Sequence, residues 1–140
     1  SDIKCDLRKL EIGSDNADAV AAIHVLEHFY EYEVFDVLTE WKRVLKPNGK
    51  MILELPCMDK VFAYIHNCVV TKTPLMPFMT LHVLYGDPKY KDPAMCHRWG
   101  WFEVPLKQML ESVGMERIEF KEPNYHFPFR DMRIECYKGS

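Results

Sequence analysis

The sequence predicts an α/β fold in which a sheet with parallel strands ends in a C-terminal antiparallel hairpin. Three observations lead to this prediction. Residues 17–25, ADAVAAIHV, form an almost continuous apolar run, which suits a strand buried on both faces of a parallel sheet. Residues 33–45 carry apolar side chains at helical spacing. Residues 115–121 and 131–137 alternate between polar and apolar side chains, as strands of a half-buried hairpin do.

The helix predicted at residues 33–45 connects two strands. Its apolar face is formed by Val34, Val37, Leu38, Trp41, Val44 and Leu45. Acidic residues near its start and basic residues near its end suit the helix dipole, and Pro47-Asn48-Gly49 is expected to stop it. Residues 50–55, KMILEL, follow as a second strand. The order strand, helix, strand predicts a βαβ unit with a right-handed crossover.

Residues 57–102 are expected to form a cap or an insertion beside the sheet. Prolines interrupt most of this segment, although residues 57–70 suit a helix. A further helix is predicted from about Pro105 to Val113, with Gly114 ending it. With 140 residues, the chain fits one domain that includes this cap.

Composition argues against several classes of partner. The net charge of −3 gives no basic surface of the kind that binds nucleic acid. No basic and apolar leader opens the sequence, and no stretch approaches the roughly 18 apolar residues of a membrane span. Five cysteines, an odd number without CxxC spacing, favour reduced thiols over disulfides or a zinc site. We therefore expect a cytoplasmic protein with no nucleic-acid partner and no membrane partner.

Four segments, in a fixed order, resemble the motifs of one enzyme family. They are Asp6-Leu7, then NADAVAAIHVLEHF at 16–29, LTEWKRVLKPNGKMILELP at 38–56 and HRWGWFEVPLKQMLESVGMERIEF at 97–120. Their order and spacing are similar to those of the class I S-adenosylmethionine-dependent methyltransferases of type 11. The resemblance implies a partial Rossmann-like methyltransferase sheet, with S-adenosylmethionine as the cofactor.

The resemblance covers only the C-terminal half of the family's domain. In the family, the first strand ends in an acidic, glycine-rich turn that lets the backbone approach the cofactor. No two of the six glycines in this sequence form a Gly-x-Gly, and the acidic residue that holds the cofactor's ribose has no counterpart. Residues 1–140 are therefore expected to be one truncated methyltransferase-like domain, with residues 57–102 as its cap.

The resemblance also assigns candidate cofactor and catalytic residues. Asp6 and Leu7 match the position that contacts the adenine, and His24 matches a position near the transferred methyl group. His24 and His28 follow a strand at the edge where α/β sheets bind ligands, and His28 suits a base at neutral pH. Alternatively, Asp6 caps a surface turn, while Glu27 and His28 orient the next segment. No metal site is assigned, because His24, Glu27 and His28 lack a standard ligand spacing.

An aromatic and basic cluster follows the cap, and the resemblance implies that it lies over the acceptor pocket. The candidate substrate-binding residues are Tyr85, His97, Arg98, Trp99 and Trp101. Aromatic faces and a guanidinium suit a sugar or an anionic small molecule. The alternative is that Trp99 and Trp101 pack the cap onto the sheet. On that reading, Trp99→Ala destabilises the fold more than Arg98→Ala does.

Two functions remain open from the sequence. One is a methyltransferase for a small-molecule acceptor, inactive as this isolated chain. The other is a non-catalytic remnant that serves as a dimerisation or binding module. The family places its first strand beside the strand that matches residues 17–25, so this apolar strand is expected to have an unpaired edge unless residues 3–6 cover it. We therefore expect a homodimer through the edge of residues 17–25.

Overall fold

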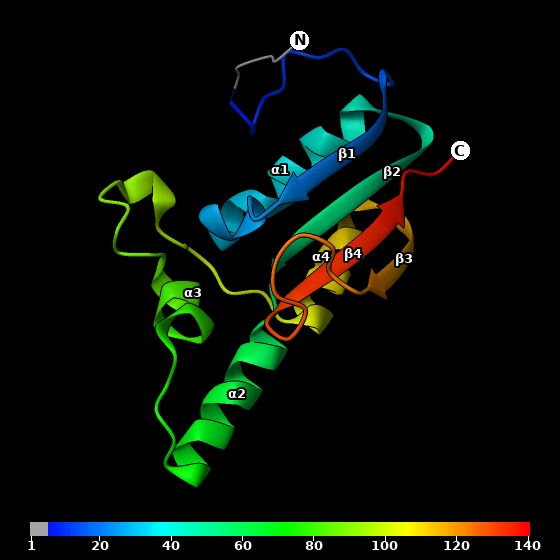
Figure 1. The fold of residues 1–140 in the computed structure, drawn as a ribbon. Coiled ribbons are helices and arrows are strands. Elements are labelled where there is room, and N and C mark those ends of the chain that lie inside the picture. The colour runs from blue at the N-terminus through cyan, green and yellow to red at the C-terminus, as the bar shows by residue number, and fades with distance from the viewer. Residues whose placement is uncertain (1–5) are drawn as a thin grey trace.

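A computed structural model of the chain describes residues 6–140 as a four-stranded mixed sheet with helices (Figure 1). The strands are β1 (Ala17–Ile23), β2 (Leu45–Pro56), β3 (Glu116–Lys121) and β4 (Asp131–Tyr137). Their order in the sheet is β1-β2-β4-β3, with β1 parallel to β2 and β4 antiparallel to both of its neighbours. This confirms the predicted α/β class and the terminal hairpin. Of the strand expected at residues 3–6, all but Asp6 lies outside the described residues.

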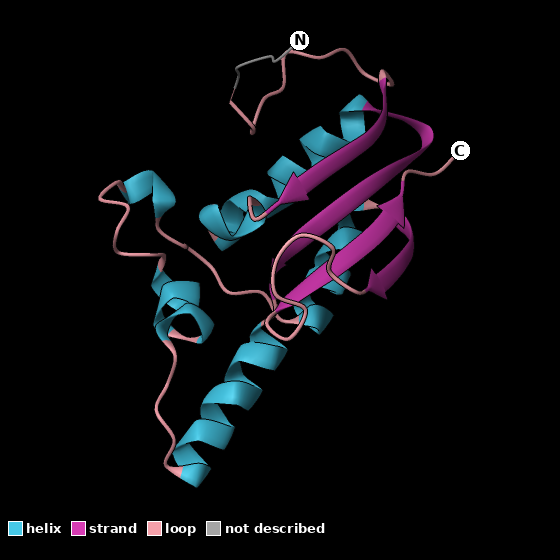
Figure 2. Ribbon diagram, viewed as in Figure 1, coloured by secondary structure: helices cyan, strands magenta, loops and turns pink. Residues whose placement is uncertain are grey.

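Seven helical elements accompany the strands in the described part of the chain (Figure 2). They are η1 (Leu26–His28), α1 (Glu31–Val44), α2 (Met58–Thr71), η2 (Pro77–Met79), α3 (Leu81–Tyr85), η3 (Pro93–Met95) and α4 (Glu103–Val113). In the segment 57–102, α2 confirms the helix expected at residues 57–70, and α3 adds a short helix that was not expected. Both extend away from the sheet. None of the helices in residues 6–140 is long and apolar enough to cross a membrane.

The main core lies between one face of the sheet and the helices α1 and α4, which lie behind the sheet in Figure 1. All six residues of the predicted α1 face are buried. The strands contribute alternate side chains to the same core, namely Met51, Leu53 and Leu55 from β2 and Met132, Ile134 and Cys136 from β4. α4 ends at Gly114, whose φ of 90° is the left-handed conformation expected of a glycine cap. Periodicity therefore located both helices and their buried faces.

The prediction that residues 17–25 are buried on both faces is wrong. β1 stops at Ile23, and only Ala22 in it is fully buried. The reason is its position, because β1 is the edge of the described sheet and pairs only with β2. An apolar run without alternation can also come from small side chains, and β1 has four alanines. Among residues 6–140 its other edge is unpaired, as expected from the sequence, while residues 3–5, which could cover this edge, lie outside the described residues.

The turn predicted at Pro47-Asn48-Gly49 lies inside β2 and not between helix and strand. α1 ends at Val44, and β2 begins at the next residue. The register with β1 then jumps from Ala17↔Leu45 to Ala19↔Lys50, so the turn residues bulge out of the ladder. Asn48 has a φ of 64°, and a Cβ on Gly49 would lie 2.8 Å from the carbonyl oxygen of Lys46. The backbone at Asn48 and Gly49 therefore turns as these residue types predict, but β2 continues through the turn.

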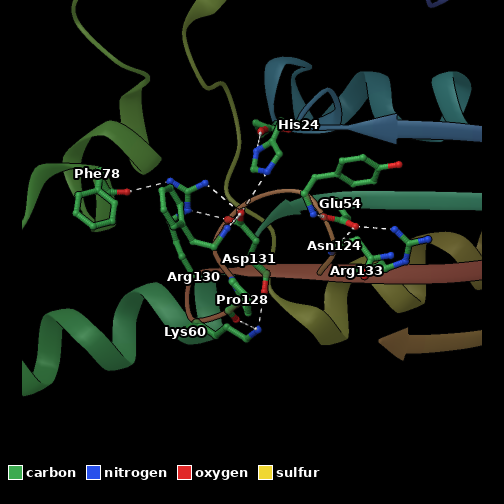
Figure 3. A network of polar contacts seen from close by, with 12 residues as sticks. His24, Glu54, Lys60, Phe78, Asn124, Pro128, Arg130, Asp131 and Arg133 are labelled. Atoms are coloured by element: carbon green, nitrogen blue, oxygen red, sulfur yellow. Dashed lines mark hydrogen bonds and ion pairs between the residues drawn. The ribbon is translucent and has the colours of Figure 1, made fainter. Parts of the chain in front are cut away.

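The other face of the central strands carries charged side chains. Glu54 on β2 is fully buried and accepts a hydrogen bond from Arg133 on β4 at 2.6 Å (Figure 3). Arg133 also donates to Glu135 at 2.8 Å, and Lys50 pairs with Glu135 at 2.7 Å. In this row of alternating charges each charged group has a partner of opposite sign. Without such partners, burial of these groups would destabilise the fold.

The pairing of Glu135 predicts a specific loss of stability in acid. Hydrogen bonds from Lys50 and Arg133 lower the pKa of Glu135 from 4.5 to about 2. A lowered folded-state pKa stabilises the fold above the unfolded value, and this contribution is lost as the pH falls through the folded value. We expect the difference in unfolding free energy between wild type and Glu135→Gln to be constant above pH 4.5 and to shrink between pH 4.5 and about 2. Urea unfolding at several pH values measures it, and a difference independent of pH contradicts the expectation.

Candidate functional site

Three strand ends meet at one edge of the sheet and form the candidate site. His24 follows the last residue of β1, and its backbone N–H donates to the carbonyl of Glu54 at 2.7 Å. Pro56, the last residue of β2, lies opposite Asp131, the first residue of β4. Because β4 runs antiparallel, its start reaches the edge where the parallel strands end. This is the edge at which α/β sheets bind ligands.

A pocket of about 420 Å³ lies at this edge, and we call it the histidine pocket. Five of the six histidines of the sequence line it, namely His24, His28, His82, His97 and His126. Three aromatic side chains also line it, namely Phe78, Tyr90 and Phe127, together with the charged side chains of Asp87, Lys89 and Arg130. A mostly apolar cavity with a few converging polar groups is the usual form of a small-molecule site.

His24 is held between two carboxylates. Its Nδ1 lies 3.2 Å from Oε2 of Glu27, and its Nε2 lies 3.2 Å from Oδ2 of Asp131, close enough for an ion pair but not aligned as a hydrogen bond. Burial lowers the pKa of His24, but the two carboxylates outweigh it and raise the pKa from 6.5 to about 9. His24 is therefore an imidazolium at neutral pH, so it can orient or donate but cannot act as a base.

Asp131 is the second partner in this ion pair and is also completely buried. Arg130 donates to both of its carboxylate oxygens, at 2.7 and 3.1 Å, and to the carbonyl of Phe78 at 3.1 Å (Figure 3). Burial raises the pKa of Asp131, but contacts with His24 and Arg130 outweigh it and lower the pKa to about 2. The floor of the pocket is therefore a fixed array of paired charges.

His28 and His97 face each other at the pocket, with ring centroids 4.8 Å apart and an edge-to-face geometry. His28 comes from η1, and His97 comes from the segment that precedes α4. Arg98 fixes the two segments together, since its backbone N–H donates to the carbonyl of Glu27 at 2.8 Å and its side chain donates to the carbonyl of His28 at 2.9 Å. The structure thus brings together His24 and His28, predicted from one motif, and His97, predicted from another.

A second pocket of about 350 Å³ adjoins this site and contains the residues assigned to the cofactor, apart from Asp6. Leu7, His24, His28 and Arg98 all line it. The carboxylate of Asp6 is exposed and accepts hydrogen bonds from the backbone and the side chain of Arg8, at 2.9 and 3.5 Å. These contacts with Arg8 are those expected if Asp6 caps a surface turn, which was the alternative to contact with the adenine.

The remaining predicted substrate residues lie away from the histidine pocket. Tyr85 ends α3 with 69% of its surface exposed. Trp99 and Trp101 line a separate hollow beside α4. Trp101 is buried in the main core, while Trp99 is 48% exposed. Of the two tryptophans, only Trp101 packs into the core, so the expectation that Trp99 is buried between cap and sheet is wrong.

Sequence reasoning missed several residues that form the pocket. Arg130 and His126 come from the loop before β4, and His82 comes from α3. Asp131, the first residue of β4, does not line the pocket but pairs with two residues that do, His24 and Arg130. One signal was available for Asp131, because an acidic residue opens a strand predicted to be antiparallel. No local pattern identified the others, since their approach depends on how the cap and the last loop fold.

Known proteins match this chain over different parts of its length. Residues 2–53 match a family model described as a methyltransferase domain. The ubiquinone/menaquinone biosynthesis C-methyltransferase UbiE of Cupriavidus taiwanensis is 27% identical over 117 residues, which are 83% of this chain and 46% of that protein. The enzyme of the same name from Cupriavidus metallidurans is 26% identical over the same length. The chain thus spans about half the length of the curated relatives it matches.

Solved structures share the fold at low sequence identity. An S-adenosylmethionine-dependent methyltransferase from Methanosarcina mazei has a TM-score of 0.61 and 18% identity, over 96% of this chain and 65% of that one. The 1,6-didemethyltoxoflavin-N1-methyltransferase of Burkholderia thailandensis, solved with its substrate and S-adenosylhomocysteine, has a TM-score of 0.62 and 11% identity, over 99% of this chain and 50% of that one. Residues 2–53 are thus similar to a methyltransferase domain, and the described residues share the fold of S-adenosylmethionine-dependent methyltransferases.

Proposed function

We propose that this chain binds the methyl acceptor of an S-adenosylmethionine-dependent methyl transfer, and that the acceptor is a small aromatic molecule. The observation that carries this proposal is the histidine pocket at the carboxyl ends of β1 and β2. Its aromatic wall suits a flat ring, and its imidazoles suit hydroxyl groups on that ring. The curated relatives are named for quinone biosynthesis, which supports a hydroxylated aromatic ring as the acceptor.

The residues of this chain supply positioning and a proton acceptor. S-adenosylmethionine supplies an activated methyl group on a sulfonium, so catalysis depends mainly on holding the acceptor in line. His24 fits a positioning role, because its ring is fixed by Glu27 and Asp131. His28 fits the proton acceptor, because its Nδ1 is bonded to the carbonyl of Cys96 at 3.2 Å, which leaves Nε2 with a lone pair. In the transfer, the bond between the methyl carbon and the sulfonium sulfur would break, with its electron pair left on sulfur, as the acceptor's nucleophilic atom bonds to that carbon, and the acceptor's hydroxyl proton would pass to such a nitrogen.

A methyl-transfer assay tests this proposal. Wild-type chain is incubated anaerobically with naphthohydroquinone and millimolar tritium-labelled S-adenosylmethionine, and the labelled product is extracted. The millimolar cofactor offsets the weak cofactor binding expected of the isolated chain. We therefore expect slow product formation with wild type and with His66→Ala, whose side chain is exposed on α2, and much less with His28→Ala. Acceptor binding without any product from wild type contradicts an enzymatic function and supports a binding module.

The sequence also predicts weak cofactor binding by the isolated chain. The residues present fit only part of the cofactor, since Leu7 and His24 line the second pocket but no Gly-x-Gly turn or ribose carboxylate occurs in these 140 residues. Each lost charge-assisted contact costs about 1.5–3 kcal/mol, so two of them weaken binding by roughly 100-fold or more. Calorimetric titration with S-adenosylmethionine measures this, and a micromolar dissociation constant is the result that contradicts it.

We further propose that the chain forms a homodimer through β1. The observation that favours this is the edge of β1, which is unpaired among the described residues and contains no lysine or proline. Such an edge pairs readily with a second strand. We expect a dimer by light scattering at tens of micromolar, and a shift toward monomer for Ala21→Lys, whose side chain is exposed. A monomeric wild type, or a variant that dimerises equally well, rules this interface out.

A further inference from the structure

Three side chains converge at the histidine pocket, and two of them, His28 and His97, line it. Glu27, His28 and His97 each offer one nitrogen or oxygen atom, and these atoms all lie within 4.8 Å of one another. Two of the three residues are neighbours in η1, and the third comes from a distant segment. The bonds made by Arg98 to the carbonyls of Glu27 and His28 hold the two segments in this arrangement.

Both imidazoles are oriented by backbone carbonyls. Nδ1 of His97 lies 2.6 Å from the carbonyl oxygen of Val83, and Nδ1 of His28 lies 3.2 Å from that of Cys96. A carbonyl only accepts, so each Nδ1 carries the proton and each Nε2 keeps its lone pair. Metal-binding histidines are fixed in this way, with one ring N–H donated to a carbonyl or carboxylate and the other nitrogen on the metal.

Glu27 supplies the second, independent observation. It is only 2% exposed, and its Oε2 contacts Nδ1 of His24 at 3.2 Å. Its other oxygen, Oε1, is buried and has no hydrogen-bond partner among the described residues. A buried carboxylate oxygen without a partner is costly, and native proteins rarely leave one unsatisfied. A cation between this oxygen and the two imidazoles removes that cost.

We propose that Glu27, His28 and His97 bind a zinc ion, with one coordination position open to the histidine pocket. Two imidazole nitrogens and one carboxylate oxygen are a common three-ligand set for zinc, and the open position then takes an oxygen from water or from a ligand. His24 is not part of this set, because both of its nitrogens already face carboxylates. The ligand pattern escaped notice in the sequence because its third member, His97, lies far along the chain.

A second cluster, Cys57, Asp59 and Glu103, has similar proximity but different chemistry. Burial raises the pKa of the Cys57 thiol to about 11, and its sulfur points a weak hydrogen bond at each of the two carboxylates. A thiol that keeps its proton is a poor zinc ligand, because the thiolate is the form that binds metal. Cys57, Asp59 and Glu103 are therefore a competing candidate zinc site, and the experiment must distinguish it from the site at Glu27, His28 and His97.

The zinc site deepens the proposed function in one respect. If the acceptor carries a hydroxyl group, its oxygen takes the open position beside the histidine pocket. Nε2 of His28 is then a metal ligand, so the metal, and not His28, activates that hydroxyl group. This step rests on the proposed function, whereas metal binding by the three side chains does not. A test of metal binding alone therefore fails or succeeds independently of methyl transfer.

Calorimetric titration of the chelator-treated chain with zinc chloride tests the site. We expect one ion per chain for wild type, and affinity lower by roughly 100-fold or more for His28→Gln and for His97→Gln, because loss of even an outer-shell partner costs 10–100-fold. The matched control, His82→Gln, lines the same pocket outside the ligand set and is expected to bind zinc as wild type does. Circular dichroism checks that each variant is folded.

Cobalt absorption on wild type gives an answer that needs no variant. Ligation by two nitrogens and one oxygen predicts visible bands of a four- or five-coordinate ion without the intense thiolate band of a cysteine ligand. The proposal is overturned if wild type binds no zinc, if the cobalt spectrum shows thiolate ligation, or if Cys57→Ser abolishes binding while His97→Gln does not.

Discussion

Trp101→Ala is expected to lower the free energy of unfolding by about 3–5 kcal/mol, the usual cost of truncating a buried tryptophan. Trp101 is 2% exposed and packs into the main core. Its indole N–H is buried without a hydrogen-bond partner in the described part of the chain. Trp101→Phe therefore costs much less than Trp101→Ala, because it keeps most of the ring and removes the unpaired donor.

The matched control for this prediction is Trp99→Ala. Trp99 is 48% exposed, so its truncation is expected to change the unfolding free energy by only about 0.5 kcal/mol. Urea unfolding followed by far-ultraviolet circular dichroism is the suitable measurement, because each substitution removes a fluorophore. Equal losses for the two alanine variants contradict the assignment of Trp101 as the residue that packs the cap onto the sheet.

Glu54→Leu is the second change with a large expected effect. The carboxylate of Glu54 accepts from Arg133 at 2.6 Å and from the backbone N–H groups of Asn124 and Tyr125 at 3.0 and 3.2 Å (Figure 3). Leucine leaves the guanidinium buried beside an apolar side chain and removes the anchor of the last loop. Removing one partner of a buried ion pair costs about 3–5 kcal/mol.

A double variant separates the ion pair from simple loss of packing. In Glu54→Leu with Arg133→Met, both charges are absent, so the loss of stability is expected to be smaller than the sum of the two single losses. The control, Glu119→Leu, lies on β3 with its side chain 59% exposed and is expected to be nearly neutral. Strict additivity of the two single variants indicates that Glu54 and Arg133 do not interact across the sheet.

Much of the fold could be predicted from the sequence because its signals are local. The apolar face of α1, the glycine that ends α4 and the alternation in β4 each depend on a few neighbouring residues. The position of β1 at the sheet edge could not be predicted from its composition, since an alanine-rich run suits both central and edge strands. The continuation of β2 through Pro47-Asn48-Gly49 depends on contacts with the C-terminal segment, where Asn48 donates to Lys138 at 3.1 Å.

Only part of the candidate site could be predicted from the sequence, because only part of it depends on local signals. The Leu26-Glu27-His28 motif marks the end of β1, and the resemblance to the methyltransferases points to His24 and His97. The partners that set their chemistry come from elsewhere, since Asp131 raises the pKa of His24 and the carbonyl of Val83 orients His97. These contacts depend on the path of the cap and of the last loop, which no periodic pattern encodes.

Nuclear magnetic resonance of histidine side chains tests the central claim most directly, namely that the histidine pocket binds an aromatic acceptor. Chain with isotope-labelled histidine is titrated anaerobically with naphthohydroquinone, and each resonance is assigned with a single His→Gln variant. The account predicts that the signals of His28 and His97 shift as the ligand is added, while that of His66, exposed on α2, stays in place. Unchanged signals for the pocket histidines at millimolar ligand, or a shift confined to His66, would contradict it.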